Sequence, residues 1–170
     1  MHKTHVLGFA GYSGSCKTTL IETLIPQLEK MGIRTAVIKH DAHGLRFDAE
    51  GKDSQRFSAA GAVCSLVSGP GQSAIFLREP LSLERSLGIL AVLSDVDLIL
   101  IEGYKDNRYP QIGVMRTENG KGFTNKTERF EALVTDDGSV TAQIPVFYPD
   151  DVEAVAAYIV DNMKNFEISL

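Results

Sequence analysis

The sequence predicts an α/β fold in which helices cover both faces of a mostly parallel central sheet. Three observations predict it. Short apolar runs alternate along the chain with longer segments of helical periodicity. A glycine-containing loop at 11–18 follows the first apolar run and opens the first helical segment, and the apolar run at 97–102 ends on a carboxylate. Alternation of this kind is typical of sheets that bind ligands at the carboxyl ends of their strands.

Length and composition set broad limits on the class of protein. The 170 residues predict one domain over 1–170, and the apolar fraction of 44% is ordinary for a globular chain. A formal charge of −5 argues against nonspecific nucleic-acid binding, which needs a basic surface. No run is long enough to span a membrane, and the first residues lack a signal-peptide pattern. We therefore expect a cytoplasmic protein that binds neither membrane nor nucleic acid.

The first βαβ unit is the clearest local pattern. Residues 6–10 and 35–39 are short apolar runs that predict buried strands. Between them, Pro26 predicts a kink in a helix and Gly32 predicts its C-terminal end. Four apolar residues recur at helical spacing: Leu20, Leu24, Leu28 and Met31. The crossover of this unit should be right-handed.

The rest of the chain continues the alternation. We expect helices at 54–60, 83–93 and 151–163, a hairpin of strands at 63–68 and 74–78, and further strands at 96–101, 112–116, 132–134 and 146–148. The run 96–101 is the most apolar, so we place it at the sheet centre. Asp150 is expected to cap the last helix.

The loop at 11–18 carries the strongest functional signal. It reads Gly-Tyr-Ser-Gly-Ser-Cys-Lys-Thr and matches the phosphate-loop pattern G-x-x-x-x-G-K-[ST] except at position 16. In this motif, backbone N–H groups at a helix N-terminus surround the β-phosphate. The lysine reaches the β- and γ-phosphates, and the hydroxyl residue ligates Mg²⁺. We expect nine residues to bind the nucleotide: Gly11, Tyr12, Ser13, Gly14, Ser15, Cys16, Lys17, Thr18 and Thr19. The fold is therefore predicted to be that of a P-loop NTPase.

Cys16 departs from the motif. A residue with a Cβ is strained by about 1–2 kcal/mol where glycine takes a positive φ. We expect a tolerated substitution that weakens nucleotide affinity. A redox-sensitive thiol is the alternative, because a helix N-terminus lowers a thiol's pKa.

Two strands end on acids at the expected ligand edge. Glu102 closes an apolar strand as a Walker B acid does, so we assign it to Mg²⁺ and to the catalytic machinery together with Lys17. Asp41 is a second candidate for the metal's water shell. His40 and His43 are interpreted as hydrogen-bonding residues. The segment 39–56 is locally basic and would suit a second anionic ligand.

The base-binding residues leave a weaker signal. Thr135 and Asp136 follow an apolar strand end, where a carboxylate can accept hydrogen bonds from guanine N1 and N2. The Asn-Lys-Thr-Glu sequence at 125–128 is similar to a guanine motif, but no buried strand precedes it. We therefore assign base recognition to Thr135 and Asp136.

With these residues the chain resembles the molybdopterin-guanine dinucleotide biosynthesis protein B family, called MobB. The resemblance spans nearly the whole chain and is strongest at 11–19, 38–40, 51–54, 60–62 and 97–105. It implies a homodimeric GTP-binding protein with weak GTPase activity and Mg²⁺ as the metal. It also implies an adaptor for the guanylyltransferase partner that joins GMP to molybdopterin, with molybdopterin or its guanine dinucleotide as a ligand. By position, Glu102 becomes the Walker B acid and 39–56 a surface for the pterin phosphate.

Three other functions remain open on the residues alone. The chain could be an ATP-dependent small-metabolite enzyme resembling dethiobiotin synthetase. It could be a nickel-delivery GTPase that uses His40 and His43. The last is a non-hydrolysing adaptor whose loop Cys16 has disabled. Nucleotide preference, metal binding and the effect of Cys16→Gly distinguish them.

Overall fold

The computed structural model describes residues 4–41, 53–93, 95–104 and 107–168. Contacts divide the chain into two compact units, the first formed by 1–40 and 87–170 and the second by 41–86. The single domain expected from the length stays a prediction.

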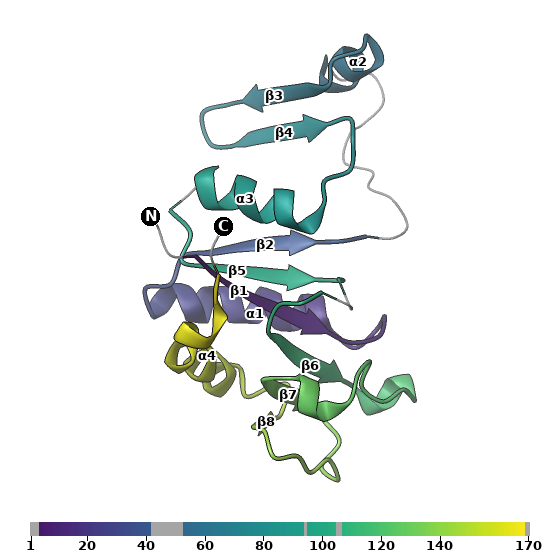
Figure 1. Ribbon diagram of the computed structural model, residues 1–170, viewed down its shortest axis with the longest axis vertical. Helices are drawn as coiled ribbons and strands as arrows, with labels where there is room; N and C mark the ends of the chain where they lie inside the picture. Colours follow the sequence, from purple (N-terminus) through teal and green to yellow (C-terminus); the bar gives the residue numbers. More distant parts are fainter. Residues whose placement is uncertain (1–3, 42–52, 94, 105–106, 169–170) are drawn as a thin grey trace. The chain divides into compact units, whose positions relative to one another are not determined.

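The first unit is built on a parallel sheet with strand order β2-β5-β1-β6-β7-β8 (Figure 1). A short antiparallel strand, β9, pairs with the start of β1. Phe9 in β1 and Lys39 in β2 are both in register with Glu102 in β5, so three carboxyl ends meet at one edge. The strands are β1 (Thr4–Ala10), β2 (Thr35–Lys39), β5 (Leu98–Glu102), β6 (Gln111–Met115), β7 (Ala132–Thr135), β8 (Val146–Phe147) and β9 (Glu167–Ile168).

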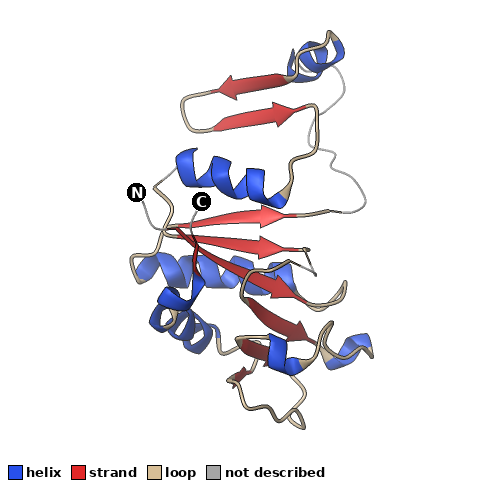
Figure 2. Cartoon of the chain, viewed as in Figure 1, coloured by secondary structure: helices blue, strands red, loops and turns tan. Residues whose placement is uncertain are grey.

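Two helices, α1 (Lys17–Lys30) and α4 (Val152–Asp161), pack against one face of this sheet (Figure 2). The apolar stripe of α1 supplies the fully buried Leu24 and Leu28. From the same face of β1, Leu7 and Phe9 complete the core. The helix ends beside Gly32, whose φ of +81° suits glycine. This packing fixes the position of the loop that joins β1 to α1.

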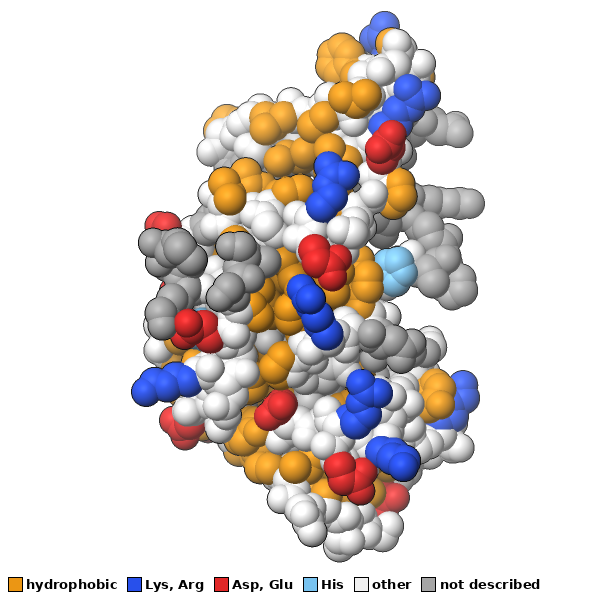
Figure 3. All heavy atoms as spheres, viewed as in Figure 1, with side chains coloured by type: hydrophobic (Ala, Val, Ile, Leu, Met, Phe, Trp, Pro, Cys, Tyr) orange, Lys and Arg blue, Asp and Glu red, His pale blue; other side chains and the backbone are white. Residues whose placement is uncertain are grey.

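The second unit contains α2 (Asp53–Ala59) and an antiparallel hairpin of β3 (Cys64–Ser68) and β4 (Ser73–Leu77). Hydrophobic side chains lie on its surface (Figure 3), among them Val63 and Leu66, which are 76% and 64% exposed. Helix α3 (Leu83–Leu93) crosses the boundary between the units at residue 87.

Most elements lie within two residues of the ranges predicted from the sequence, including the hairpin and all four α-helices. The run predicted at the sheet centre forms β5, an interior strand between β2 and β1 that is buried throughout. One prediction is wrong: α4 has Asp151 and not Asp150 at its N-cap, and that side chain makes no capping hydrogen bond. Three short 3₁₀ helices, η1 (Thr117–Asn119), η2 (Thr127–Arg129) and η3 (Met163–Phe166), and strand β9 were not predicted. Within the described ranges, no helix is long and apolar enough to cross a membrane.

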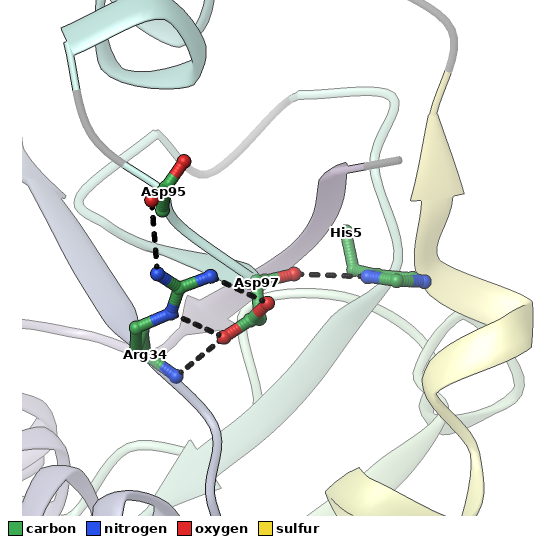
Figure 4. Close-up of polar contacts among 4 residues, drawn as sticks. All are labelled: His5, Arg34, Asp95 and Asp97. Atoms are coloured by element: carbon green, nitrogen blue, oxygen red, sulfur yellow. Dashed lines mark hydrogen bonds and ion pairs between the residues drawn. The ribbon is translucent and has the colours of Figure 1, made fainter. Parts of the chain in front are cut away.

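A network of hydrogen bonds and ion pairs among Arg34, Asp95 and Asp97 lies at the amino edge of the sheet (Figure 4). Arg34 donates from its backbone N–H and from Nε to Asp97 Oδ2, at 2.9 and 3.1 Å, and its guanidinium lies 3.3 Å from Asp95. The hydrogen bond to Asp97 raises the pKa of Arg34 above its ordinary value. His5 Nδ1 lies 2.9 Å from the backbone carbonyl of Asp97. These contacts lie at the opposite end of the strands from the candidate site, so they do not occupy the carboxyl edge.

Candidate phosphate-binding site

The loop between β1 and α1 has the form of a phosphate-binding loop. Lys17 Nζ donates to the backbone carbonyl of Tyr12 at 2.9 Å and to Ser15 Oγ at 3.3 Å, so the lysine side chain lies back across the loop. Gly14 takes a φ of +81°, which a glycine adopts without steric cost. A Cβ on Gly11 would collide with the buried Ser15 side chain and with the Val114 carbonyl. The loop is therefore closed by its own lysine and requires glycine at its start.

Cys16 occupies the N-cap of α1 with φ 61° and ψ 26°, in the left-handed region. Among the described residues it is the one non-glycine with a positive φ. The position therefore has the backbone conformation for which the motif carries glycine, and cysteine adopts it with strain. The thiol is exposed, with Sγ 3.9 Å from the Gly14 carbonyl. Strain at this residue falls on the loop that would enclose a phosphate.

Thr18 and Glu102 meet at the carboxyl edge of the sheet. Thr18 Oγ1 donates to Glu102 Oε1 at 2.8 Å, and Glu102 is 9% exposed. Lys39 Nζ lies 3.6 Å from Glu102 Oε2 and donates to Thr18 Oγ1 at 3.3 Å. A hydroxyl and a carboxylate so close to a phosphate loop are the oxygen donors that Mg²⁺ takes alongside substrate phosphates. The donor set fits the metal expected from the sequence.

Gly103, directly after Glu102, allows the backbones at the ends of β2 and β5 to lie close together. Its φ is +99°, and a Cβ there would lie 2.5 Å from the His40 carbonyl oxygen. His40 donates its backbone N–H to the Glu102 carbonyl at 2.9 Å, and its ring stacks on Tyr104 with centroids 4.5 Å apart. His40 is thus a packing and backbone partner of the acidic strand end, a role that its position in the sequence did not reveal.

Some predicted site residues lie outside the described ranges or are described only in part. His43 and most of the segment 39–56 are outside them, so the anionic-ligand surface stays a prediction. Asp41 is exposed and follows His40 directly, and its part in metal binding is a prediction too. In the described part of the chain, no group of three or more histidine, cysteine or acidic side chains is arranged to hold a metal ion.

The two residues expected to recognise the base make contacts within the protein. Thr135 is 2% exposed, and its Oγ1 donates to Met115 Sδ at 3.5 Å and accepts from the Asp137 N–H at 3.1 Å. Asp136 accepts a 2.8 Å hydrogen bond from the Thr117 backbone N–H and lies 3.5 Å from the Arg116 guanidinium. The Thr117 hydrogen bond lowers the pKa of Asp136 below its ordinary value. Base recognition by this pair stays a prediction.

The connection between β6 and β7 lies over the phosphate loop, an arrangement that no sequence pattern predicted. Asn119, the last residue of η1, places Oδ1 2.9 Å from where a Cβ on Gly14 would lie. Lys121 Nζ lies 5.4 Å from the centre of the Tyr12 ring, within the range of a cation–π contact. The adjoining segment thus adds positive charge beside the loop.

A parallel sheet of this order, a lysine-closed loop between its central strand and α1, and an acid on the neighbouring strand define a P-loop nucleotide-binding fold. The family model described as "MobB: Molybdopterin guanine dinucleotide synthesis protein B" matches residues 6–136. The chain belongs to this family, as the sequence features predicted.

Similar proteins agree with that assignment. A molybdopterin-guanine dinucleotide biosynthesis adapter protein from Escherichia coli is 34% identical over 165 residues, covering 94% of this chain and 93% of the relative. An adapter protein of the same name from Haemophilus influenzae is 41% identical over 133 residues, covering 76% of this chain and 74% of the relative. The crystal structure of Bacillus subtilis MobB superimposes with a TM-score of 0.76 at 26% identity, covering 94% of this chain and 98% of that one. Helicobacter pylori HypB, at 15% identity and a TM-score of 0.52 over 98% and 91% of the two chains, shares the fold alone.

Proposed function

We propose that this chain binds GTP with Mg²⁺ on its phosphate loop and serves as an adaptor in molybdopterin guanine dinucleotide biosynthesis. The observation that carries the nucleotide part is the closed loop, in which Lys17 returns to the Tyr12 carbonyl at 2.9 Å. The adaptor part rests on family membership and on the names of its relatives.

The loop supplies the phosphate contacts in this proposal. In this proposal, backbone N–H groups of the loop between Gly11 and Thr18 bind phosphate oxygens at the N-terminal end of α1, where the helix dipole favours an anion. Lys17 exchanges its carbonyl partner for phosphate oxygens when a nucleotide enters. Thr18 and Glu102 would hold Mg²⁺ with their side-chain oxygens. The metal would neutralise negative charge on the β- and γ-phosphates.

Hydrolysis is proposed to be slow. Phosphoryl transfer by P-loop proteins depends on positioned charge, and an arginine finger contributes about 10³–10⁵ to the rate. Glu102 orients water at the γ-phosphate end, and the nearby Lys39 ammonium adds one positive charge. A slow enzyme of this kind suits an adaptor, because the nucleotide-bound state persists while a partner is engaged.

The remaining parts of the proposal follow the family. The chain is a cytoplasmic homodimer that binds molybdopterin or its guanine dinucleotide and engages the guanylyltransferase that makes the dinucleotide. Light scattering of the purified chain tests the dimer, and co-purification with a guanylyltransferase from the same source tests the partner. A monomer that does not change on addition of nucleotide would contradict the dimer.

Calorimetric titration with GTP and with ATP, each with Mg²⁺, tests the nucleotide proposal. We expect GTP binding with a clear preference over ATP, reduced at least tenfold in Lys17→Ala. Lys30→Ala, at the far end of α1, is the matched control and should bind as the parent chain does. ATP preference would favour a metabolite enzyme, and no binding by the parent chain or by Cys16→Gly would overturn the proposal.

A further inference from the structure

A cavity of about 200 Å³ lies beside the phosphate loop at the carboxyl edge of the first unit. Cys16 and Thr19 form its wall on the side of α1, and Val134 forms part of its apolar floor. Pro149 and Asp150, from the connection between β8 and α4, close the other side. Its volume is below the 300–1,000 Å³ of pockets that enclose whole drug-sized ligands. It suits one flat ring system better than a complete nucleotide.

The cavity lies where the nucleoside part of a nucleotide would leave the phosphate loop. Cys16 belongs to the phosphate loop, and Thr19 is in the first turn of α1, directly after the residues that would hold the phosphates. A nucleoside attached to phosphates in that loop has to leave along the carboxyl edge of the sheet, where ligands of such folds lie. The cavity opens at this point and is lined by apolar side chains of β6 and β7, which suit the faces of a base.

Asp150 is the one acid among the described residues that line the cavity, and two further acids, Asp136 and Asp137, directly follow β7. Asp136 accepts from the Thr117 N–H and pairs with Arg116, which also lines the cavity. Asp137 accepts from the backbone N–H and hydroxyl of Ser139, at 2.9 and 2.6 Å. Across the described residues, the exposed carboxylate of Asp150 has no hydrogen-bond or ion-pair partner. Asp150 is therefore the acid on this cavity that keeps both oxygens available to a ligand.

We infer that Asp150 reads the guanine base, a specificity role that rests on the proposed GTP binding. Guanine presents two adjacent donors, N1–H and the 2-amino group, which one carboxylate accepts together through charge-assisted hydrogen bonds. Adenine presents an acceptor at N1 and no 2-amino group, so its lone pair would face the carboxylate. A site built for a hydrogen-bonding partner rejects an analogue that leaves its polar groups unpaired.

The test exchanges hydrogen-bond donor and acceptor both on the side chain at position 150 and on the base of the nucleotide. In Asp150→Asn the side-chain amide can donate to the 2-carbonyl of xanthine, which replaces the 2-amino group of guanine. Calorimetric titration of the full chain with Mg²⁺ and GTP, ATP or xanthosine triphosphate measures the change. We expect Asp150→Asn to lose about 10- to 100-fold in GTP affinity. We also expect it to gain affinity for xanthosine triphosphate, which a misfolded variant cannot do.

Asp151→Asn is the matched control, because this neighbouring acid is exposed and does not line the cavity. It should leave both affinities unchanged. GTP affinity that is retained in Asp150→Asn, or a switch to xanthosine triphosphate in Asp136→Asn, would overturn the assignment of Asp150 and leave the proposed function standing. Equal affinity of the parent chain for GTP and ATP would also overturn it. Absence of any nucleotide binding would overturn the inference and the proposed function together.

Discussion

The hydroxyl of Thr18 donates a 2.8 Å hydrogen bond to Glu102, which lies 84 positions away in the sequence. The contact joins the phosphate loop to the end of β5, so the two oxygen donors proposed for Mg²⁺ lie side by side. Preorganised ligands reduce the cost of ordering side chains around a metal. Either donor should therefore matter more with Mg²⁺ than without it.

We predict that Glu102→Gln removes most of the gain in GTP affinity that Mg²⁺ provides, by about tenfold or roughly 1.4 kcal/mol. The amide is neutral, so it holds a hydrated cation less well than the carboxylate does. GTP titrations with Mg²⁺ and with EDTA give the difference. Glu22→Gln, an exposed position on α1, is the control. An equal loss of affinity in EDTA would mean that Glu102 supports the loop and not the metal.

Lys39 should have the opposite dependence on the metal. Its ammonium lies 3.6 Å from Glu102 and 3.3 Å from Thr18 Oγ1, beside the donors that Mg²⁺ would use. We predict that Lys39→Met weakens GTP binding in EDTA and strengthens its dependence on Mg²⁺, because one competing positive charge is removed. The side chain is half exposed, so each change should be about twofold to fivefold. Titration of GTP against Mg²⁺ concentration measures both, and a uniform loss at all Mg²⁺ concentrations would contradict the prediction.

Cys16 offers a test of backbone strain. We predict that Cys16→Gly raises the free energy of unfolding by about 0.5–1 kcal/mol, since relief of left-handed strain exceeds the extra chain entropy that glycine loses. Urea unfolding measures this change. Affinity for GTP should rise as well, because the loop reaches its conformation without strain. Cys64→Gly, in the exposed hairpin strand β3, should be destabilising. A lower stability of Cys16→Gly would show that the loop does not store strain at this residue.

The sequence predicted the parts of the site that depend on local pattern. The phosphate loop has a fixed spacing, and the special backbone at position 16 followed from the glycine that the motif carries there. The end of β5 was found because an apolar run delivers one acid. The cavity near Asp150 was not found, because α1, β6, β7 and the β8–α4 connection meet only in the folded chain. The sequence did not show that Asp136 has a partner within the protein. That partner, Thr117, lies in a 3₁₀ helix that no sequence pattern predicted.

Asp136 should make the stability of the fold depend on pH in the acid range. Its folded pKa lies below the ordinary value of 3.8, chiefly because the Thr117 N–H donates to the carboxylate. A lowered pKa means that the ionised group stabilises the fold above its unfolded pKa, and that this contribution disappears as pH falls through the lower folded value. We predict that Asp136→Asn lowers the unfolding temperature at pH 7 and reduces its decline below pH 4. Thermal unfolding between pH 7 and pH 2.5 checks this, with Asp161→Asn as the control. Parallel curves for parent and Asp136→Asn would contradict the prediction.

Substitution of Gly103 should destabilise the fold. A φ of +99° and a Cβ position 2.5 Å from the His40 carbonyl leave no room for a side chain. We predict that Gly103→Ala lowers the free energy of unfolding by about 2 kcal/mol or more, from backbone strain and the clash together. Gly122→Ala is the control, because nothing lies within 4 Å of a Cβ there.

Because β2 and β5 would separate next to Glu102, the dependence of GTP binding on Mg²⁺ should weaken in Gly103→Ala as well. Urea unfolding and GTP titration on the same variant check both effects. Full stability with weakened metal dependence would mean that Gly103 serves the site alone, whereas a loss of stability with unchanged binding would mean that the pairing of β2 with β5 does not position Glu102.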